Sequence, residues 1–169
     1  ERHEEQEQRL EVIVESYNLK TVLSSLISSH PYEEVAYEVY KTENQHPLIG
    51  SGMVGDLEEG MSEMDFMKYL KKALNVECIR HTALRSKTVK KVAFCGGSGS
   101  FLLKNAIAAK ADVFITGDFK YHDFFDSEGR VVIMDVGHYE SEQFTIELIA
   151  EKLQEKFPIF AVLKTKVNT

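Results

Sequence analysis

Residues 111–118 read ADVFITGD, a short apolar run that ends in a glycine and an aspartate. Similar runs lie on either side of it, KVAFCGG at 91–97 and RVVIMDVGH at 130–138. Continuous apolar runs of this length are typical of strands that are buried on both faces of a sheet. The intervals between them are long enough for crossover helices, which join strands that pair in parallel. The three runs therefore predict a mostly parallel α/β sheet that is covered by helices.

The segments between and after these strands supply the expected helices of a three-layer α/β half-domain over residues 84–169. They are SFLLKNAIAAK (100–110), FKYHDFFD (119–126) and YESEQFTIELIAEKLQEKF (139–157). Pro158 is expected to end the last helix, because proline removes a backbone donor and restricts the residue before it. IFAVL at 159–163 then predicts a closing strand.

Residues 9–83 show a different order of elements. Alternating apolar residues, or clusters of β-branched and aromatic residues, predict strands at 9–16, 35–42, 50–58 and 76–83. Apolar residues at helical spacing predict one helix after Asn18 and another after Ser62. The resulting β-α-β-β-α-β order is that of a ferredoxin-like domain.

Two polar stretches mark the limits of this expected domain. Residues 1–8 are almost entirely polar and are expected to be a tail or linker. The basic stretch LRSKTVKK at 84–91 is the expected boundary between the ferredoxin-like domain and the α/β half-domain.

The composition is that of an ordinary globular protein. Of the 169 residues, 43% are hydrophobic and 28% are charged, and the formal net charge is −7. The negative charge disfavours general binding to nucleic acid or to anionic membranes. No apolar stretch reaches the ~18–20 residues that a membrane helix needs, and the opening ERHEEQEQRL is unlike a signal peptide.

The two cysteines, Cys78 and Cys95, lie in apolar segments and form no CxxC pair, so they encode no thiolate zinc site. We expect both to be small buried residues of a protein in a reducing compartment. A cytoplasmic location follows as the default.

Glycines follow the first strand of the predicted sheet, in the stretch CGGSGS at 95–100. Gly96, Gly97 and Gly99 allow a tight turn that brings backbone N–H groups close to a ligand, and Ser98 adds a hydroxyl group. The stretch lacks the lysine-serine pair of a Walker loop. Two interpretations stay open: a contact to an anionic substrate, or a glycine turn without a ligand.

A histidine and an acid follow each of the next two strands. Asp118 and His122 are four residues apart, and so are His138 and Glu142, so each pair shares a face if its segment is helical. Mixed imidazole and carboxylate ligands suit Zn²⁺, Mn²⁺ or Fe²⁺ better than Ca²⁺. We expect His138 and Glu142 to bind metal, with Asp118 and His122 around the metal or on the substrate side. The alternative for each pair is a simple surface hydrogen bond.

Five motifs occur together in this chain, namely SSHPYEEVAYEVY, GSGMVGDL, VAFCGGSGSFL, ADVFITGDFKYHD and DVGHYESE. In this order they resemble the Nif-three-like family, also known as GTP cyclohydrolase I type 2 homologues. The resemblance covers nearly the whole chain from residue 9. It implies a core α/β domain in two halves, a P-II-like ferredoxin-fold insert between them, and assembly into a ring-shaped hexamer.

The resemblance also implies a site for two divalent metal ions per complete subunit, zinc, manganese or iron. It makes His138 and Glu142 metal ligands and places Asp118 and His122 beside the metals. The family's other ligands, a His-His pair and an aspartate, belong to an N-terminal half that precedes the insert, and this sequence contains no His-His pair. We therefore expect this chain to be the insert and the C-terminal half, with an incomplete metal site and a missing N-terminal half-domain as its partner.

Two functions follow from these expectations. The first is a metal-dependent hydrolase acting on a nucleotide or another phosphate-bearing small molecule, with His122 and Asp118 as catalytic groups and residues 96–99 holding the phosphate. The alternative is a non-enzymatic metal-binding assembly or regulatory protein.

Overall fold

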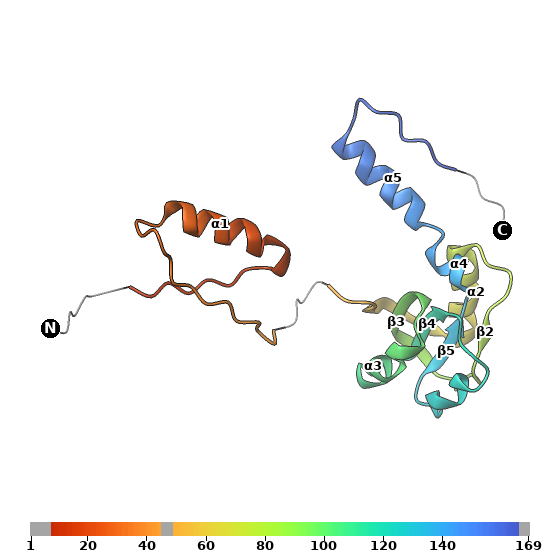
Figure 1. The fold of residues 1–169 in the computed structure, drawn as a ribbon. Coiled ribbons are helices and arrows are strands. Elements are labelled where there is room, and N and C mark those ends of the chain that lie inside the picture. Colours follow the sequence, from red (N-terminus) through yellow and green to blue (C-terminus); the bar gives the residue numbers. More distant parts are fainter. Residues whose placement is uncertain (1–7, 45–48, 166–169) are drawn as a thin grey trace. The chain divides into compact units, whose positions relative to one another are not determined.

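The computed structural model describes residues 8–44 and 49–165 of the chain. Its internal contacts divide the chain into two units, Glu1–Gln45 and His46–Thr169. Figure 1 shows the helical segment of the first unit and the sheet and helices of the second.

The first unit contains the helix α1, Leu19–Ser29, which follows a short 3-10 turn, η1, at Ser16–Asn18. The helix begins after Asn18, as predicted, and ends at His30, whose extended backbone (φ −77°, ψ 138°) is the conformation favoured before a proline. Among residues 8–44 the structure has no strand, so the strands expected at 9–16 and 35–42 are not observed.

The second unit is built on a five-stranded sheet with the order β1-β3-β4-β5-β2 (Figure 1). The strands are β1 (Met53–Ser62), β2 (Arg80–His81), β3 (Thr88–Ser98), β4 (Val113–Gly117) and β5 (Val132–Asp135). The three central strands, β3, β4 and β5, are parallel to one another. They are the three apolar runs of the sequence, so the predicted parallel core is confirmed. The two outer strands run antiparallel to their neighbours.

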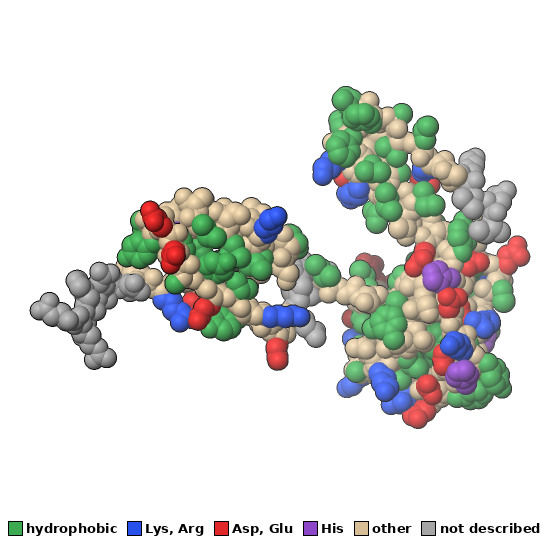
Figure 2. Space-filling view, in the orientation of Figure 1, with side chains coloured by type: hydrophobic (Ala, Val, Ile, Leu, Met, Phe, Trp, Pro, Cys, Tyr) green, Lys and Arg blue, Asp and Glu red, His purple; other side chains and the backbone are tan. Residues whose placement is uncertain are grey.

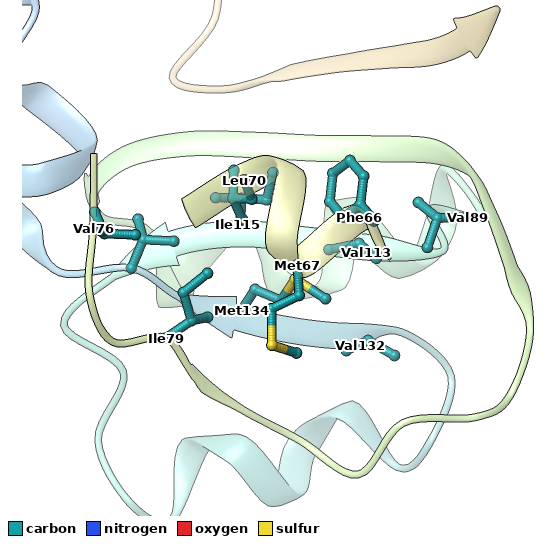
Figure 3. Close-up of a cluster of buried hydrophobic side chains, with 11 residues drawn as sticks. Phe66, Met67, Leu70, Val76, Ile79, Val89, Val113, Ile115, Val132 and Met134 are labelled. Atoms are coloured by element: carbon teal, nitrogen blue, oxygen red, sulfur yellow. The ribbon is translucent and has the colours of Figure 1, made fainter. Parts of the chain in front are cut away.

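Helices cover both faces of this sheet, because alternate side chains of the buried strands point to opposite sides. On one face Phe66, Met67 and Leu70 of α2 (Glu63–Leu74) pack on the sheet, in a cluster that Figure 3 shows. Leu103 and Ala106 of α3 (Leu103–Ala108) pack on the other face. From β4 and β5, the first cluster takes Val113, Ile115, Val132 and Met134, and the second takes Phe114 and Ile133 together with Val131, which directly precedes β5.

The ferredoxin-like domain expected over residues 9–83 is not confirmed. The segment expected as its third strand forms β1, which pairs with β3, from Met53 opposite Phe94 to Ser62 opposite Thr88. The segment expected as its last strand is reduced to β2 and pairs with β5. α2 likewise lies on the parallel sheet, so contacts divide the chain after Gln45 rather than at the expected boundary of 84–91.

The last predicted helix is broken in two. α4 spans His138–Glu142 and α5 spans Thr145–Lys156. No residue of α5 is buried, and Figure 2 shows hydrophobic side chains on the surface of this helix. The closing strand expected at 159–163 is absent from the described structure.

The remaining predicted segments are shorter than expected. The segment 100–110 forms a 3-10 turn, η2 (Ser100–Leu102), before α3, and only the end of 119–126 is helical, as η3 (Asp123–Ser127). Cys95 is buried as expected, whereas Cys78 is exposed. Within residues 8–44 and 49–165, none of the helices is both long and apolar enough to cross a membrane.

Candidate metal centre

His138 and Glu142 meet at the carboxyl end of β5. Gly137 (φ 96°) turns the chain out of the strand, His138 is the first residue of α4 and Glu142 is the last. Residues four apart on a helix face the same side, and here Nε2 of His138 lies 3.2 Å from Oε2 of Glu142. The convergence of this pair is as the spacing predicted.

Asp118 contacts the other nitrogen of the same imidazole. It follows β4 with a left-handed backbone (φ 57°), and its Oδ2 lies 2.6 Å from Nδ1 of His138. A carboxylate at Nδ1 accepts that N–H and fixes the orientation of the ring, as is usual for imidazoles that bind metal through Nε2. Asp118 therefore orients the imidazole and does not face the position between His138 and Glu142.

The surroundings of His138 favour its protonated form. The hydrogen bond to Asp118 raises the pKa of His138 above its usual range, partial burial opposes this, and the Glu142 carboxylate adds to the rise. The side chains of His138, Asp118 and Glu142 are 51%, 52% and 49% exposed. All three can therefore be reached from solvent.

Gly97, at the end of β3, leaves room for this pair. A Cβ atom added there would lie 2.5 Å from Oε1 of Glu142 and 3.1 Å from Nε2 of His138, and the backbone φ of +63° disfavours other residues. The Gly97 N–H donates to Oγ of Ser141 (2.8 Å), and its carbonyl oxygen accepts from Oγ1 of Thr116 (3.1 Å). This N–H is therefore already used and does not point to an anion.

The other three residues of the predicted substrate loop lie along the same strand end. A Cβ atom on Gly96 would lie 3.4 Å from Cγ of Glu142, and Gly99 lies against the side chain of Thr116. Ser98 is exposed and pairs with Gly117 of β4. The structure thus brings Gly96 and Gly97 to Glu142, while the substrate role of residues 96–99 stays a prediction.

His122 does not join these residues. Its side chain is 77% exposed, and its Nε2 lies 3.4 Å from Oδ1 of the adjacent Asp123. The expected helical relation to Asp118 is not formed, because the chain turns at Asp118 and η3 begins only at Asp123. Asp118 and His122 therefore do not share a helix face.

Two residues that the sequence analysis did not select hold the site together. Asp135 is buried at the end of β5 and bonds to the loops that carry Asp118 and His138. Ser141 accepts from Gly97 and donates to the carbonyl oxygen of His138 at 2.8 Å. The sequence does place Asp135 at the end of an apolar run, which could have marked it as a candidate. No pattern in the sequence indicates the role of Ser141.

The donor set fits two ligands of a divalent ion such as zinc. Imidazole nitrogen and carboxylate oxygen are both common zinc ligands, and the imidazole has the oriented Nδ1–H that such ligands normally have. Among the residues that the structure describes, no group of three or more His, Cys, Asp or Glu side chains could hold a metal ion. The described residues therefore offer one pair, His138 and Glu142, with donor types that a divalent ion can bind.

Comparisons with known proteins agree with the sequence motifs. The family described as Duf34/NIF3 (NGG1p interacting factor 3) matches residues 8–169. The GTP cyclohydrolase 1 type 2 homolog of Staphylococcus epidermidis is 34% identical over an alignment 169 residues long, which covers 95% of this chain and 45% of the relative. That of Bacillus subtilis is 36% identical over 148 residues, 87% of this chain and 39% of the relative. The chain thus spans less than half the length of these relatives.

Solved structures show the same fold. A Bacillus cereus protein related to NIF3 aligns with a TM-score of 0.67 and 33% identity, covering 85% of this chain and 40% of that protein. The Staphylococcus aureus protein SA1388 aligns with a TM-score of 0.73 and 26% identity, covering 96% of this chain and 54% of that protein. With a family match over nearly its whole length, this chain belongs to the Duf34/NIF3 family.

Proposed function

We propose that this chain supplies one half of a divalent-metal site, with His138 and Glu142 as ligands and Asp118 as the group that orients the imidazole. The observation that carries the proposal is the arrangement around one ring: Glu142 faces Nε2 at 3.2 Å while Asp118 occupies Nδ1 at 2.6 Å. A simple surface hydrogen bond between His138 and Glu142 would not require a second carboxylate, from the loop after β4, to contact the other nitrogen of the ring.

The complete site requires ligands from outside the described residues. We propose that an N-terminal half-domain of the longer protein contributes them, so that a complete subunit holds two divalent ions, zinc, manganese or iron, and that subunits assemble into a cytoplasmic hexamer. Bound there, such an ion would lower the pKa of a coordinated water molecule and polarise a scissile group. The part of this chain is to present Nε2 and a carboxylate in a fixed orientation.

The proposed activity of the longer protein is hydrolysis of a nucleotide or another phosphate-bearing small molecule. Its support is the name of the relatives, GTP cyclohydrolase 1 type 2 homolog, together with the opening of the half-site to solvent. His122 as general acid or base stays a prediction, since its side chain is largely exposed and its imidazole contacts Asp123.

A non-enzymatic metal-binding assembly or regulatory protein is the second candidate. The contact of His122 favours it, because the imidazole of this expected general acid or base faces Asp123 and is largely exposed. The two candidates share the half-site and differ in whether a substrate turns over.

The half-site is tested by titrating the 169-residue chain with Zn²⁺ and measuring the heat of binding. We expect weak, chelator-reversible binding that is lost in His138→Ala and kept in the matched control His122→Ala. Binding that survives His138→Ala unchanged would show that the metal is held elsewhere and would overturn the proposal.

The activity is tested on a protein that spans the length of the relatives. Metal-loaded wild type and His138→Ala are compared for turnover of nucleotides and phosphomonoesters. Turnover that His138→Ala abolishes supports the hydrolase, and metal binding without turnover in either protein supports the second candidate.

A further inference from the structure

Asp135 is a buried acid that the proposed metal site does not use as a ligand. It is the last residue of β5, and only 3% of its surface is exposed. Burying a carboxylate is costly unless its oxygens are hydrogen-bonded and its charge is balanced. The partners that meet this requirement indicate what the residue is for.

The two carboxylate oxygens of Asp135 bond to two different loops. Oδ2 accepts the N–H of Phe119 at 2.9 Å, and Oδ1 accepts the N–H of Gly137 at 3.0 Å. Phe119 directly follows Asp118, and Gly137 directly precedes His138. One side chain therefore joins the backbone next to the orienting carboxylate to the backbone next to the imidazole.

Arg80 of β2 completes the arrangement. Its guanidinium group forms an ion pair with Asp135 and donates to the carbonyl oxygen of Phe119 at 2.9 Å. The same group lies over the ring of Phe124, 5.6 Å from its centroid. Arg80 thus balances the buried charge and holds the Phe119 peptide from its other side.

The loops after β4 and β5 need such a link, because Asp118 and Gly137 lie outside the strands and are not held by strand pairing. Asp118 (φ 57°) and Gly137 (φ 96°) both have positive φ and lie just beyond the last residues of their strands. The 2.6 Å contact between Oδ2 of Asp118 and Nδ1 of His138 requires the two loops to be held to within about 0.5 Å. Phe119 anchors one loop, since its buried ring packs edge-on against Phe114 and Phe124.

Two carboxylates compete for the single proton of the neutral His138 ring. Asp118 draws it to Nδ1 at 2.6 Å, and Glu142 would draw it to Nε2 at 3.2 Å. A proton on Nε2 would occupy the lone pair that a metal ion needs. If Asp118 moves away, the proton is expected to shift to Nε2, where it faces Glu142.

We propose that Asp135, with its charge balanced by Arg80, is a positioning residue that holds Asp118 against Nδ1 of His138 and so keeps Nε2 free for a metal ion. The last clause rests on the function proposed above, whereas the hydrogen-bonded link and the proton position do not. Asp135 itself bonds to Arg80, Phe119 and Gly137 and is not one of the proposed ligands.

The test is the tautomer of His138 in Asp135→Asn, read from the ¹⁵N chemical shifts of the imidazole at a pH where the ring is neutral. Asparagine keeps the size of the side chain but offers an NH₂ group where a second backbone N–H must be accepted. We expect the wild-type chain to hold mainly the Nδ1–H form and Asp135→Asn mainly the Nε2–H form. Zn²⁺ affinity should fall about 10–100-fold in the variant, as for other partners that orient a ligand.

Glu63→Gln is the matched control, because Glu63 is an equally buried acid that bonds to backbone N–H groups at the opposite end of the sheet. It should lower stability and leave the His138 tautomer unchanged. A wild-type tautomer in Asp135→Asn would overturn the inference and leave Asp135 a purely structural residue.

The remaining outcomes separate the two proposals. A tautomer that changes in a chain whose wild type binds no Zn²⁺ would support the positioning role and overturn the half-site. If Asp135→Asn does not fold, Arg80→Met replaces it, since the Arg80 side chain is 57% exposed and its loss leaves the buried acid in place. A partial shift towards Nε2–H is then expected, and no shift would count against the inference.

Discussion

The two ends of the central sheet carry charged side chains of very different character. Before the parallel strands begin, Glu63 accepts the N–H groups of Arg85 (2.7 Å) and Ser86 (2.9 Å), and the Arg85 side chain is only 13% exposed. The Arg85 guanidinium group donates to the carbonyl oxygens of Asp112 and Arg130, which precede β4 and β5. At the other end of the strands, His138, Asp118 and Glu142 are each about half exposed.

The difference shows which charges stabilise the fold and which are available to a ligand. At the first end the Glu63 carboxylate and the Arg85 guanidinium group bond chiefly to backbone, so their removal leaves buried groups unpaired. At the second end Nε2 of His138 and the Glu142 carboxylate face each other, and both side chains are open to solvent. We call the end with Glu63 and Arg85 the closed end, and the end with His138, Asp118 and Glu142 the open end. Ligands of α/β sheets of this kind bind at the carboxyl ends of the strands, which is where the open end lies.

The largest expected effect that tests this difference between the two ends is the loss of the Glu63 carboxylate at the closed end. Glu63→Ala should lower the free energy of unfolding by about 3–5 kcal/mol, because it removes the ion pair with Arg85 and leaves two backbone N–H groups without their acceptor. Urea unfolding followed by circular dichroism measures the change. The matched variant Glu142→Ala makes the same chemical change at the open end and should alter stability by no more than about 0.5 kcal/mol. Equal losses in the two variants would remove the distinction between the ends.

The open end responds to the loss of its orienting carboxylate. Asp118→Asn should weaken Zn²⁺ binding by about 10–100-fold, since the amide no longer stabilises the Nδ1–H form of His138. Calorimetric titration of the chain measures the affinity. Asp123→Asn is the control, because Asp123 lies in η3 and contacts His122. An unchanged affinity in Asp118→Asn would mean that Asp118 has no orienting role.

The parallel core and the His138–Glu142 pair could be predicted, because both depend on local patterns. Apolar runs identify buried strands, and a spacing of four residues on a helix brings two side chains together. The positions of β1 and β2 could not, since the glycine-rich run that forms β1 does not indicate which strand it will pair with. Their pairing depends on long-range contacts, which place them at the two edges of the five-stranded sheet.

His122 and Asp135 show the same limit within the site. The spacing of Asp118 and His122 predicted a shared face only on the condition that the segment is helical, and the left-handed backbone of Asp118 removes that condition. Asp135 acts through backbone N–H groups of two loops that are distant in sequence. No pattern in the sequence predicts such contacts, because they form only when the two loops come together in the folded chain.

Acid should affect the open end at a higher pH than an ordinary histidine site. A proton and a metal ion compete for Nε2 of His138, and the Asp118 hydrogen bond raises the pKa of this residue above the usual value of about 6.5. Zn²⁺ affinity should therefore decline by about tenfold per pH unit once the pH falls below this raised pKa. Titrations between about pH 6 and about pH 8 measure the profile. In Asp118→Asn the decline should begin at a lower pH, and an identical onset in both proteins would contradict the assigned cause.

The raised pKa of His138 has the opposite effect on folding stability, which it increases at low pH. Protonated His138 is favoured in the folded chain, so its contribution to stability is fully present below the pKa of the unfolded chain and is lost as the pH rises through the folded pKa. Metal binding should thus strengthen over the pH range in which this ionic contribution disappears.

The smallest expected effect concerns the cap of α2, at the closed end. Oγ of Ser62 accepts the N–H of Asp65 at 3.1 Å, and Ser62 lies opposite Thr88, the first residue of β3. Ser62→Ala should lower the free energy of unfolding by about 1 kcal/mol, and Ser62→Asp, which keeps an acceptor, should restore most of it. Zn²⁺ affinity should be the same in all three proteins, because the cap lies at the end of the sheet opposite to His138. A cap variant that weakened Zn²⁺ binding would show that the two ends are coupled through α2, and the contrast between a structural and a ligand-binding end would then not hold.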